Sequence, residues 1–188
     1  MIHRVVARLT LSVAAICVLP ASARYRMLSR RAWNVVQFDV DATSLVLDVR
    51  AGTFGDVLEH ELRSAHGLTL GHWPQSVALS TVGGWLACRS AGQLSGRYGK
   101  IEDMVEGLDV VLADGRHLRT GGFPRAAVGP DLNQLFVGSE GTLGVITGAR
   151  LRLHPAPAHE DQGAWLLPSF ATGLEIMKAL RGWTSGLA

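Results

Sequence analysis

The stretch STVGGWLACRSAG, residues 80–92, places the strongest constraint on how this chain can fold. Gly83 and Gly84 stand side by side and precede a run whose apolar residues have the spacing of a helix. Glycine pairs usually interrupt regular structure, so their position at the start of a helix needs a reason. Two explanations are open: the pair forms an ordinary turn, or a large ligand lies against the backbone there.

Three glycine-lined segments occur within one domain: PQSVALSTVGG (74–84), CRSAG (88–92) and GSEGTLGVIT (138–147). Backbone N–H groups in such loops and at helix starts bind anions such as pyrophosphate. Each segment taken alone is better explained as a turn, but three together indicate a dinucleotide-like cofactor. The same segments offer hydroxyl groups on Ser76, Ser80, Thr81, Ser90 and Thr142.

The signatures of other common sites are missing from the sequence. No GxGxxG follows a strand, and neither GxxxxGK[ST] nor the nucleophile elbow GxSxG occurs. The seven histidines form no HExxH or other tight metal pair, so we interpret them as surface or packing residues. Cys17 and Cys88 indicate neither a disulfide framework nor a zinc site, and Cys88 is interpreted as a small packing residue. We therefore expect no metal site.

Charge separates the start of the chain from the rest. Residues 1–38 hold six arginines and no acid, out of 18 basic and 16 acidic residues in all. The remainder thus has 12 basic and 16 acidic residues, a net charge of −4, which argues against nucleic-acid binding. The arginine-rich apolar head, residues 1–27, has the pattern of a secretory signal, with ASA at 21–23 as the small-residue site. The alternatives are an apolar piece of a longer protein's interior or a wrongly assigned start.

Hydrophobic periodicity predicts an α+β fold class rather than a doubly wound sheet. One hairpin is expected to turn at DATS (41–44) and a second at Asp114-Gly115. A long strand is expected over 143–155, and a further strand over 163–170. Helices are expected from an N-cap at Thr53 to a stop at Gly67, over about 83–91, near Asp131, and over 171–183.

The wording of the central blocks goes beyond composition. The stretch from GHWPQS to VLADG, with STVGGW and YGKIEDMV inside it, and the later GSEGTLGVIT resemble the PCMH-type FAD-binding domain of the vanillyl-alcohol oxidase superfamily. Within that superfamily the resemblance is to alkylglycerone-phosphate synthase and bacterial FAD-linked oxidases. It implies a mixed antiparallel sheet flanked by helices, with the second half of the FAD-binding domain over 28–158 and the start of a C-terminal cap domain over 159–188.

The resemblance implies FAD as the cofactor, lying along the glycine pair. Arg89 faces either the cofactor or substrate, or is a surface helix residue. Carried over position by position, the cofactor-binding residues are Gln75, Ser76, Val77, Ala78, Leu79, Ser80, Thr81, Gly83, Gly84, Cys88, Arg89, Ser90, Ala91, Glu140, Gly141, Thr142, Leu143, Gly144, Val145 and Ile146.

Two features of the family are missing from this sequence. An upstream glycine-rich loop that also holds the pyrophosphate has no counterpart in residues 1–35, and the cap domain with the catalytic groups only begins. The chain therefore resembles an internal piece of a flavoenzyme, and its catalytic residues stay unassigned.

Three functions are open. The first is the synthase reaction, in which flavin N5 takes up the carbon skeleton of acyl-dihydroxyacetone phosphate and a fatty alcohol replaces the acyl group. The second is oxidation of a 2-hydroxy acid or alcohol, and the third is an inactive truncated remnant. The expected partners are a small-molecule, lipid-like substrate and no nucleic acid. For the full-length enzyme a membrane surface and a homodimer are considered, and the expected location is cytoplasmic unless the head is a signal.

Overall fold

The computed structural model describes residues 38–184, apart from 124–126, 128 and 161–162. The chain divides into two compact units, the first ending at His154 and the second beginning at Pro155. The head, residues 1–27, for which the sequence left three interpretations open, lies outside the described residues. Cys17, which is part of the head, lies outside them too.

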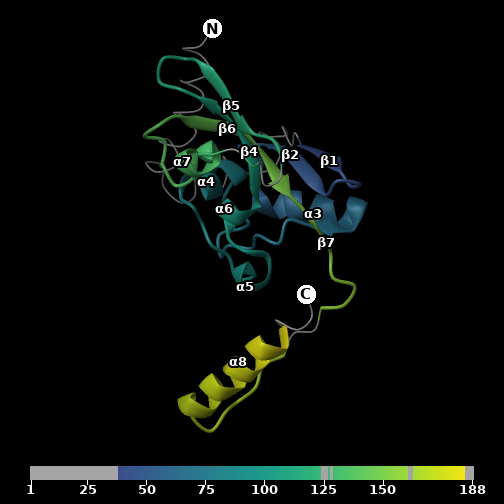
Figure 1. Ribbon diagram of the computed structural model, residues 1–188. Helices are drawn as coiled ribbons and strands as arrows, with labels where there is room; N and C mark the ends of the chain where they lie inside the picture. Colours follow the sequence, from purple (N-terminus) through teal and green to yellow (C-terminus); the bar gives the residue numbers. More distant parts are fainter. Residues whose placement is uncertain (1–37, 124–126, 128, 161–162, 185–188) are drawn as a thin grey trace, which may run out of the picture. The chain divides into compact units, whose positions relative to one another are not determined.

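A five-stranded antiparallel sheet forms the frame of the first unit (Figure 1). Its spatial order is β1-β2-β6-β4-β5, so the last long strand inserts between the two hairpins. A second, two-stranded sheet pairs β3 with β7. The strands are β1 (Phe38–Asp41), β2 (Val46–Arg50), β3 (Leu68–Thr69), β4 (Val105–Val111), β5 (His117–Gly121), β6 (Val145–Arg152) and β7 (His154–Pro155). The predicted α+β class is confirmed.

Both predicted hairpins are confirmed. In the first, the Asp41 carboxylate accepts hydrogen bonds from the Thr43 and Ser44 N–H groups and closes the turn between β1 and β2. In the second, Gly115 has a φ of 83°, the left-handed conformation that the turn between β4 and β5 requires. A side-chain acceptor therefore sets the first turn, and the backbone freedom of a glycine sets the second.

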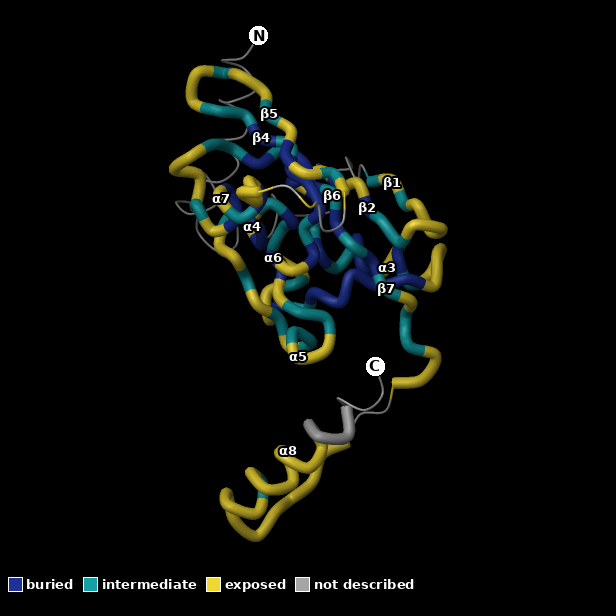
Figure 2. Tube along the Cα trace, in the orientation of Figure 1, coloured by how far each residue is buried: buried dark blue, intermediate teal, exposed yellow. Residues whose placement is uncertain are grey.

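Helices cover one side of this sheet and enclose the core (Figures 1 and 2). Alternate residues of the strands, such as Leu47, Leu108 and Leu151, are buried against them. The helix α3 contributes Leu58 and Leu62, which lie one turn apart on its inner face. The helices of the first unit are α3 (Gly55–His66), α4 (Val82–Ala87), α5 (Ser95–Tyr98), α6 (Ile101–Met104) and α7 (Leu132–Phe136).

The ends of α3 correct one prediction and confirm another. Gly67 terminates the helix in the left-handed conformation, as expected. The N-cap is Phe54, however, and not Thr53. The Thr53 hydroxyl is buried and has no hydrogen-bond partner among the described residues. The Thr53 N–H donates to the Arg50 carbonyl at the end of β2, and its carbonyl accepts from the Val82 N–H at the start of α4.

A buried carboxylate ties α3 to the strand that follows it. Glu59 accepts hydrogen bonds from the Thr69 hydroxyl and from the Leu70 N–H, and forms an ion pair of 2.7 Å with Arg63. Three donors, from the Thr69 hydroxyl, the Leu70 N–H and the Arg63 guanidinium, thus satisfy the buried Glu59 carboxylate, as a buried charge requires.

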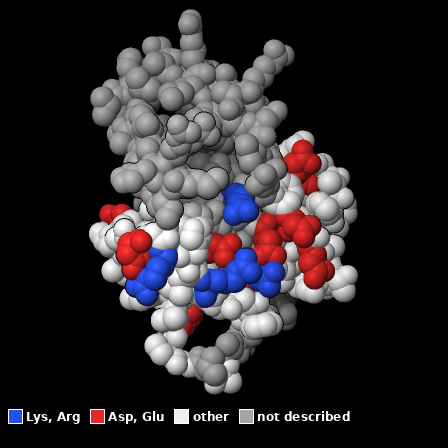
Figure 3. Space-filling model, turned by 90° about the horizontal axis from the view of Figure 1, so that it is seen from above, with Lys and Arg blue, Asp and Glu red and all other residues white. Residues whose placement is uncertain are grey.

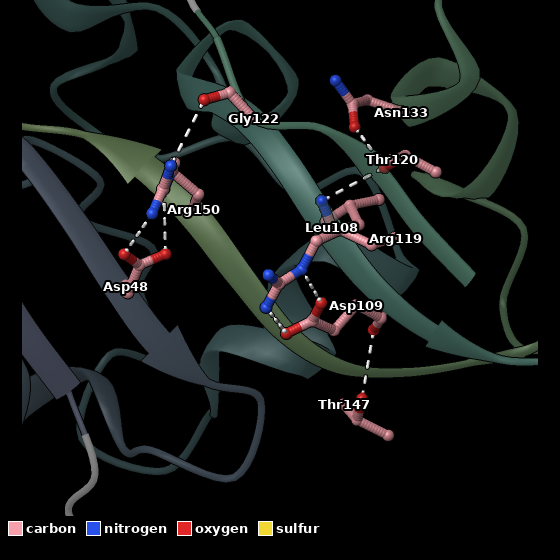
Figure 4. A network of polar contacts seen from close by, with 9 residues as sticks. All are labelled: Asp48, Leu108, Asp109, Arg119, Thr120, Gly122, Asn133, Thr147 and Arg150. Atoms are coloured by element: carbon pink, nitrogen blue, oxygen red, sulfur yellow. Dashed lines mark hydrogen bonds and ion pairs between the residues drawn. The ribbon is translucent and has the colours of Figure 1, made fainter. Parts of the chain in front are cut away.

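The opposite face of the sheet is charged. Asp48 on β2 pairs with Arg150 on β6 at 2.7 Å, and Asp109 on β4 pairs with Arg119 on β5 at 2.8 Å (Figure 4). The Arg119 guanidinium donates to Asp109 and holds the pKa of that carboxyl below its usual range. On the face drawn in Figure 3, acidic and basic side chains of the described residues lie next to one another.

The second unit contains one helix, α8 (Phe170–Thr184), in the region where a helix was expected. The strand expected over 163–170 is wrong, since residues 163–169 have no regular secondary structure and Phe170 opens the helix. Several large apolar side chains of this unit are exposed, among them Trp165, Phe170 and Met177. In the described part of the chain, no helix has the length and apolar character needed to span a bilayer.

Candidate functional site

The glycine pair lies inside the first turn of α4, which runs from Val82 to Ala87, so the helix expected over about 83–91 begins near the predicted position and ends earlier. Thr81 is the N-cap, and its hydroxyl accepts from the Gly84 N–H. The Val82 and Gly83 N–H groups donate to the carbonyls of Thr53 and Ala51. The first N–H groups of the helix are therefore bonded to protein acceptors, so they do not form an open anion site.

The two glycines have different surroundings. A Cβ added to Gly83 would lie 2.7 Å from the Cβ of Ala51, so this glycine permits α4 to pack against the end of β2. A Cβ added to Gly84 would meet only the Thr81 hydroxyl oxygen, at 3.6 Å, and Gly84 is exposed. Gly83 thus serves the architecture, while Gly84 leaves an accessible backbone surface at the start of the helix.

The segment that leads into α4 is a compact turn on the surface. The Ser80 hydroxyl accepts from the Trp85 indole N–H at 2.7 Å and donates to the Ser76 carbonyl. The Ser76 hydroxyl in turn donates to Ser80. Two of the five hydroxyls singled out in the sequence therefore hold this turn together, and Thr142 likewise donates to the Ser139 carbonyl.

The segment that leaves α4 carries Cys88, Arg89 and Ser90. Cys88 is exposed, so its interpretation as a packing residue is wrong. The Arg89 guanidinium donates to the carbonyls of Gln134 and Val137 at the end of α7. Arg89 is exposed, and its side chain caps the end of the neighbouring helix α7. Its contact with a cofactor or substrate stays a prediction.

The third segment crosses both ends of α4. The Gly138 and Glu140 N–H groups donate to the carbonyls of Leu86 and Ala87 at the end of the helix. Further along, the Thr147 carbonyl accepts from Ala51, the residue against which Gly83 packs. The fold therefore brings all three glycine-lined segments together around one short helix.

Strained backbone accompanies this convergence. Arg89 and Glu140 have φ angles of 51° and 50°, a conformation that non-glycine residues rarely adopt. Such conformations cost about 1–3 kcal/mol each and cluster at ligand sites. Here each one stands at a point where a segment turns around the end of α4.

Accessible donors remain in each segment. Outside β6, eight N–H groups there donate no hydrogen bond to any described residue: those of Gln75, Ser76, Ala78, Thr81, Ala91, Gly141, Leu143 and Gly144. A Cβ added to Gly141 would meet no atom within 4 Å, so the backbone there can be approached closely. This donor set fits an acceptor-rich ligand such as a pyrophosphate with attached ribityl chain.

Exposure of the predicted residues agrees with this geometry. Of the twenty cofactor-binding candidates, Ile146 alone is buried, and it packs in the core through β6. Gly144 is partly exposed, but a Cβ there would lie 2.7 Å from Val110, so this glycine also serves packing. Contact between these residues and a cofactor stays a prediction. No cluster of potential metal ligands occurs among the described residues.

The structure adds a residue that sequence reasoning passed over. His72 is 2% exposed, and its Nε2 lies 2.9 Å from the Ser90 hydroxyl oxygen. Its ring meets Trp85 edge-on, with ring centroids 4.8 Å apart. Burial lowers the pKa of His72 to about 4, so the ring is neutral at pH 7. The two partners are 18 residues apart in sequence, and no local pattern relates them.

Comparison with protein families gives a match over residues 22–121, to the family described as FAD binding domain. This range covers segments 74–84 and 88–92 and ends at the last residue of β5.

Individual relatives point the same way. The chain is 36% identical over 139 residues to alkyldihydroxyacetonephosphate synthase of Caenorhabditis elegans, covering 74% of this chain and 23% of that protein. It is 38% identical over 143 residues to an FAD-linked oxidoreductase of Escherichia coli strain K12, covering 76% and 29%. A solved structure of an alkyldihydroxyacetonephosphate synthase superposes with a TM-score of 0.67 at 35% identity, covering 78% of this chain and 28% of that one. The chain thus spans about a quarter of the length of these relatives.

Proposed function

Because the chain belongs to the FAD binding domain family, we propose that it holds FAD for an alkyl-transfer reaction like that of alkyldihydroxyacetonephosphate synthase. The observation that carries this proposal is the meeting of the three glycine-lined segments around α4. The residues that carry their unpaired N–H groups are partly or fully exposed, so an acceptor-rich cofactor can approach them.

The residues of this chain bind and orient the cofactor. The unpaired N–H groups of Gln75, Ser76, Ala78, Gly141, Leu143 and Gly144 supply donors for phosphate and ribityl oxygens. The open surface at Gly84 lets the cofactor lie close to α4. The internal bonds of Ser80 and Arg89 keep the segments in place before the cofactor arrives. Such preorganisation reduces the ordering cost of binding.

Bound FAD would supply an electron-accepting ring able to accept either a carbon nucleophile or a hydride. In the proposed reaction a fatty alcohol replaces the acyl group of acyl-dihydroxyacetone phosphate, so the substrate is a small lipid-like molecule. The described residues supply the platform for the cofactor. No catalytic role is assigned to any of the candidate cofactor-binding residues.

A second candidate function is oxidoreduction of a 2-hydroxy acid or alcohol. It is favoured by the similarity to the Escherichia coli FAD-linked oxidoreductase, which is comparable in identity and coverage to that of the synthase. Both candidates use the same cofactor platform. The oxidoreductase passes electrons to an acceptor, whereas the synthase needs no electron acceptor.

One assay separates the two functions. The reading frame extended on both sides is expressed, loaded with FAD and given acyl-dihydroxyacetone phosphate and a fatty alcohol without an electron acceptor. Formation of an ether product supports the synthase. Reduction of a dye by a 2-hydroxy acid, with no ether product, would replace it by the oxidoreductase. A folded protein without flavin absorbance that takes up no added FAD would overturn both.

The partners and location follow the same proposal. An acidic body with interspersed charges suits a protein that does not bind nucleic acid. For the full-length enzyme we propose a homodimer in the cytoplasm that takes its lipid-like substrate from a membrane surface. Sedimentation of that enzyme with and without lipid vesicles tests the homodimer and the membrane association. A monomer that does not bind vesicles would contradict both of these.

A further inference from the structure

The buried side of the site contains an imidazole whose two nitrogens have different surroundings. Nε2 of His72 lies 2.9 Å from the hydroxyl oxygen of Ser90. Nδ1 is buried and has no hydrogen-bond partner among the described residues. The ring is held in this orientation by its edge-on contact with Trp85, which is itself 3% exposed.

These surroundings decide which nitrogen carries the proton. The ring is neutral, because desolvation in the core disfavours its charged form. A buried N–H without an acceptor is rarer and more costly than an unpaired acceptor. The proton therefore sits on Nε2, and Nδ1 keeps only an unpaired lone pair.

The tautomer fixes the role of the Ser90 hydroxyl. Since Nε2–H donates, the Ser90 oxygen accepts, and the hydroxyl proton must be directed elsewhere. No other hydrogen bond of this hydroxyl occurs among the described residues, and Ser90 is partly exposed. The N–H of Ala91, the next residue, is also without an acceptor in the described chain. Two adjacent donors of the segment that leaves α4, the Ser90 O–H and the Ala91 N–H, thus have no acceptor among the described residues, and both residues are at least partly exposed.

We propose that His72 is a positioning residue that holds the Ser90 hydroxyl as a hydrogen-bond donor toward an acceptor atom of the bound flavin dinucleotide. The inference rests on the proposed FAD binding and assigns a task to a histidine outside the predicted cofactor-binding set. His72 itself touches no ligand. It acts through Ser90, by preventing the hydroxyl from serving as an acceptor for the ring.

FAD affinity of the chain expressed from the reading frame extended on both sides, measured by titration of flavin fluorescence, tests the proposal. Ser90→Ala is expected to raise the dissociation constant about tenfold or more, the effect of one hydrogen bond to a charged group. His72→Phe keeps the contact with Trp85 but loses the donor, so the same direction of change is expected. Combining both substitutions is expected to weaken binding no further than Ser90→Ala alone, since the two residues act through one bond.

The conservative variant distinguishes positioning from packing. His72→Gln places an amide N–H near the position of Nε2 and is expected to bind FAD within about threefold of the unmodified chain. The matched control is Ser64→Ala on the exposed side of α3, which is expected to leave affinity unchanged. Melting temperatures of all variants show whether each one folds.

The outcomes separate the two claims. If the unmodified chain binds no FAD, the proposed function falls and the inference with it. The inference alone is overturned if FAD binds with a dissociation constant that Ser90→Ala does not change. It is also overturned if His72→Gln binds FAD as weakly as His72→Phe. Nitrogen-15 NMR of the His72 ring provides an independent check without ligand, since a proton on Nδ1 would also overturn it.

Discussion

Gly83 and Ala51 are in direct contact at the junction of α4 and β2. The Gly83 N–H donates to the Ala51 carbonyl at 2.8 Å, and a Cβ on Gly83 would lie 2.7 Å from the Ala51 Cβ. A Cβ on the neighbouring Gly84 would meet only the Thr81 hydroxyl oxygen, at 3.6 Å. One glycine of the pair therefore serves packing within the protein, and the other leaves its surface open, which makes their substitutions distinguishable.

Gly83→Ala is expected to destabilise the domain. The added methyl group must push α4 away from the end of β2, at a cost of about 1–3 kcal/mol for overpacking. Urea denaturation of the two proteins measures this difference. The folded fraction is expected to keep its FAD affinity within a small factor, and an unchanged denaturation midpoint would contradict the packing role.

Gly84→Val is expected to show the opposite pattern. The branched side chain projects from an exposed position, so the domain stays folded, but the cofactor is held away from α4. Loss of one or more charge-assisted hydrogen bonds would raise the FAD dissociation constant by about tenfold to a hundredfold. A variant that melts early yet binds FAD normally when folded would show that Gly84 is also architectural.

Cys88 offers a chemical probe of the site. Its thiol is exposed at the end of α4, so a maleimide is expected to label it in the native protein. FAD at saturating concentration is expected to slow the labelling, because the predicted contacts lie on both sides of this residue. Mass spectrometry of the peptide that contains Cys88 separates it from Cys17. Labelling at the same rate with and without FAD would place the cofactor away from this segment.

The stability of the domain is expected to fall between pH 6.5 and about 4. Burial lowers the pKa of His72 from 6.5 to about 4, so the unfolded chain binds a proton in this range that the folded chain does not. This contribution is fully present above pH 6.5 and is lost as the pH falls, by about 3 kcal/mol in total. Urea denaturation across this range measures the slope.

His72→Phe is the matched control for this pH dependence. The pKa of His154 is also lowered, chiefly by burial, so part of the slope is expected to remain in the variant. The difference between the two proteins reports His72 alone. Parallel stability curves would show that His72 does not resist protonation in the folded state.

Glu59→Ala is expected to destabilise the domain without affecting the cofactor segments. The substitution leaves the Thr69 hydroxyl and the Leu70 N–H without their acceptor and removes a buried ion pair, at a cost of about 3–5 kcal/mol. Glu61→Ala, on the exposed side of the same helix, is expected to change stability by less than about 0.5 kcal/mol. Equal effects of the two substitutions would contradict the role of Glu59 as a link between α3 and β3.

Elements that depend on neighbouring residues could be predicted well. The Asp114-Gly115 turn, the stop of α3 at Gly67 and the start of α7 at Asp131 all follow from local backbone and side-chain preferences. The strand expected over 163–170 failed because a short apolar run fits several backbone conformations. The N-cap expected at Thr53 lies instead at the next residue, Phe54.

The sequence by itself determined the α+β class, the glycine-lined segments and the resemblance that indicates FAD. Tertiary structure alone decided which glycine packs against Ala51, which hydroxyls are used internally, and that His72 holds Ser90. The physical reason is the range of the interactions. Turns and helix ends depend on residues a few positions apart, whereas these contacts join residues that only the packing of α4 against the sheet brings together.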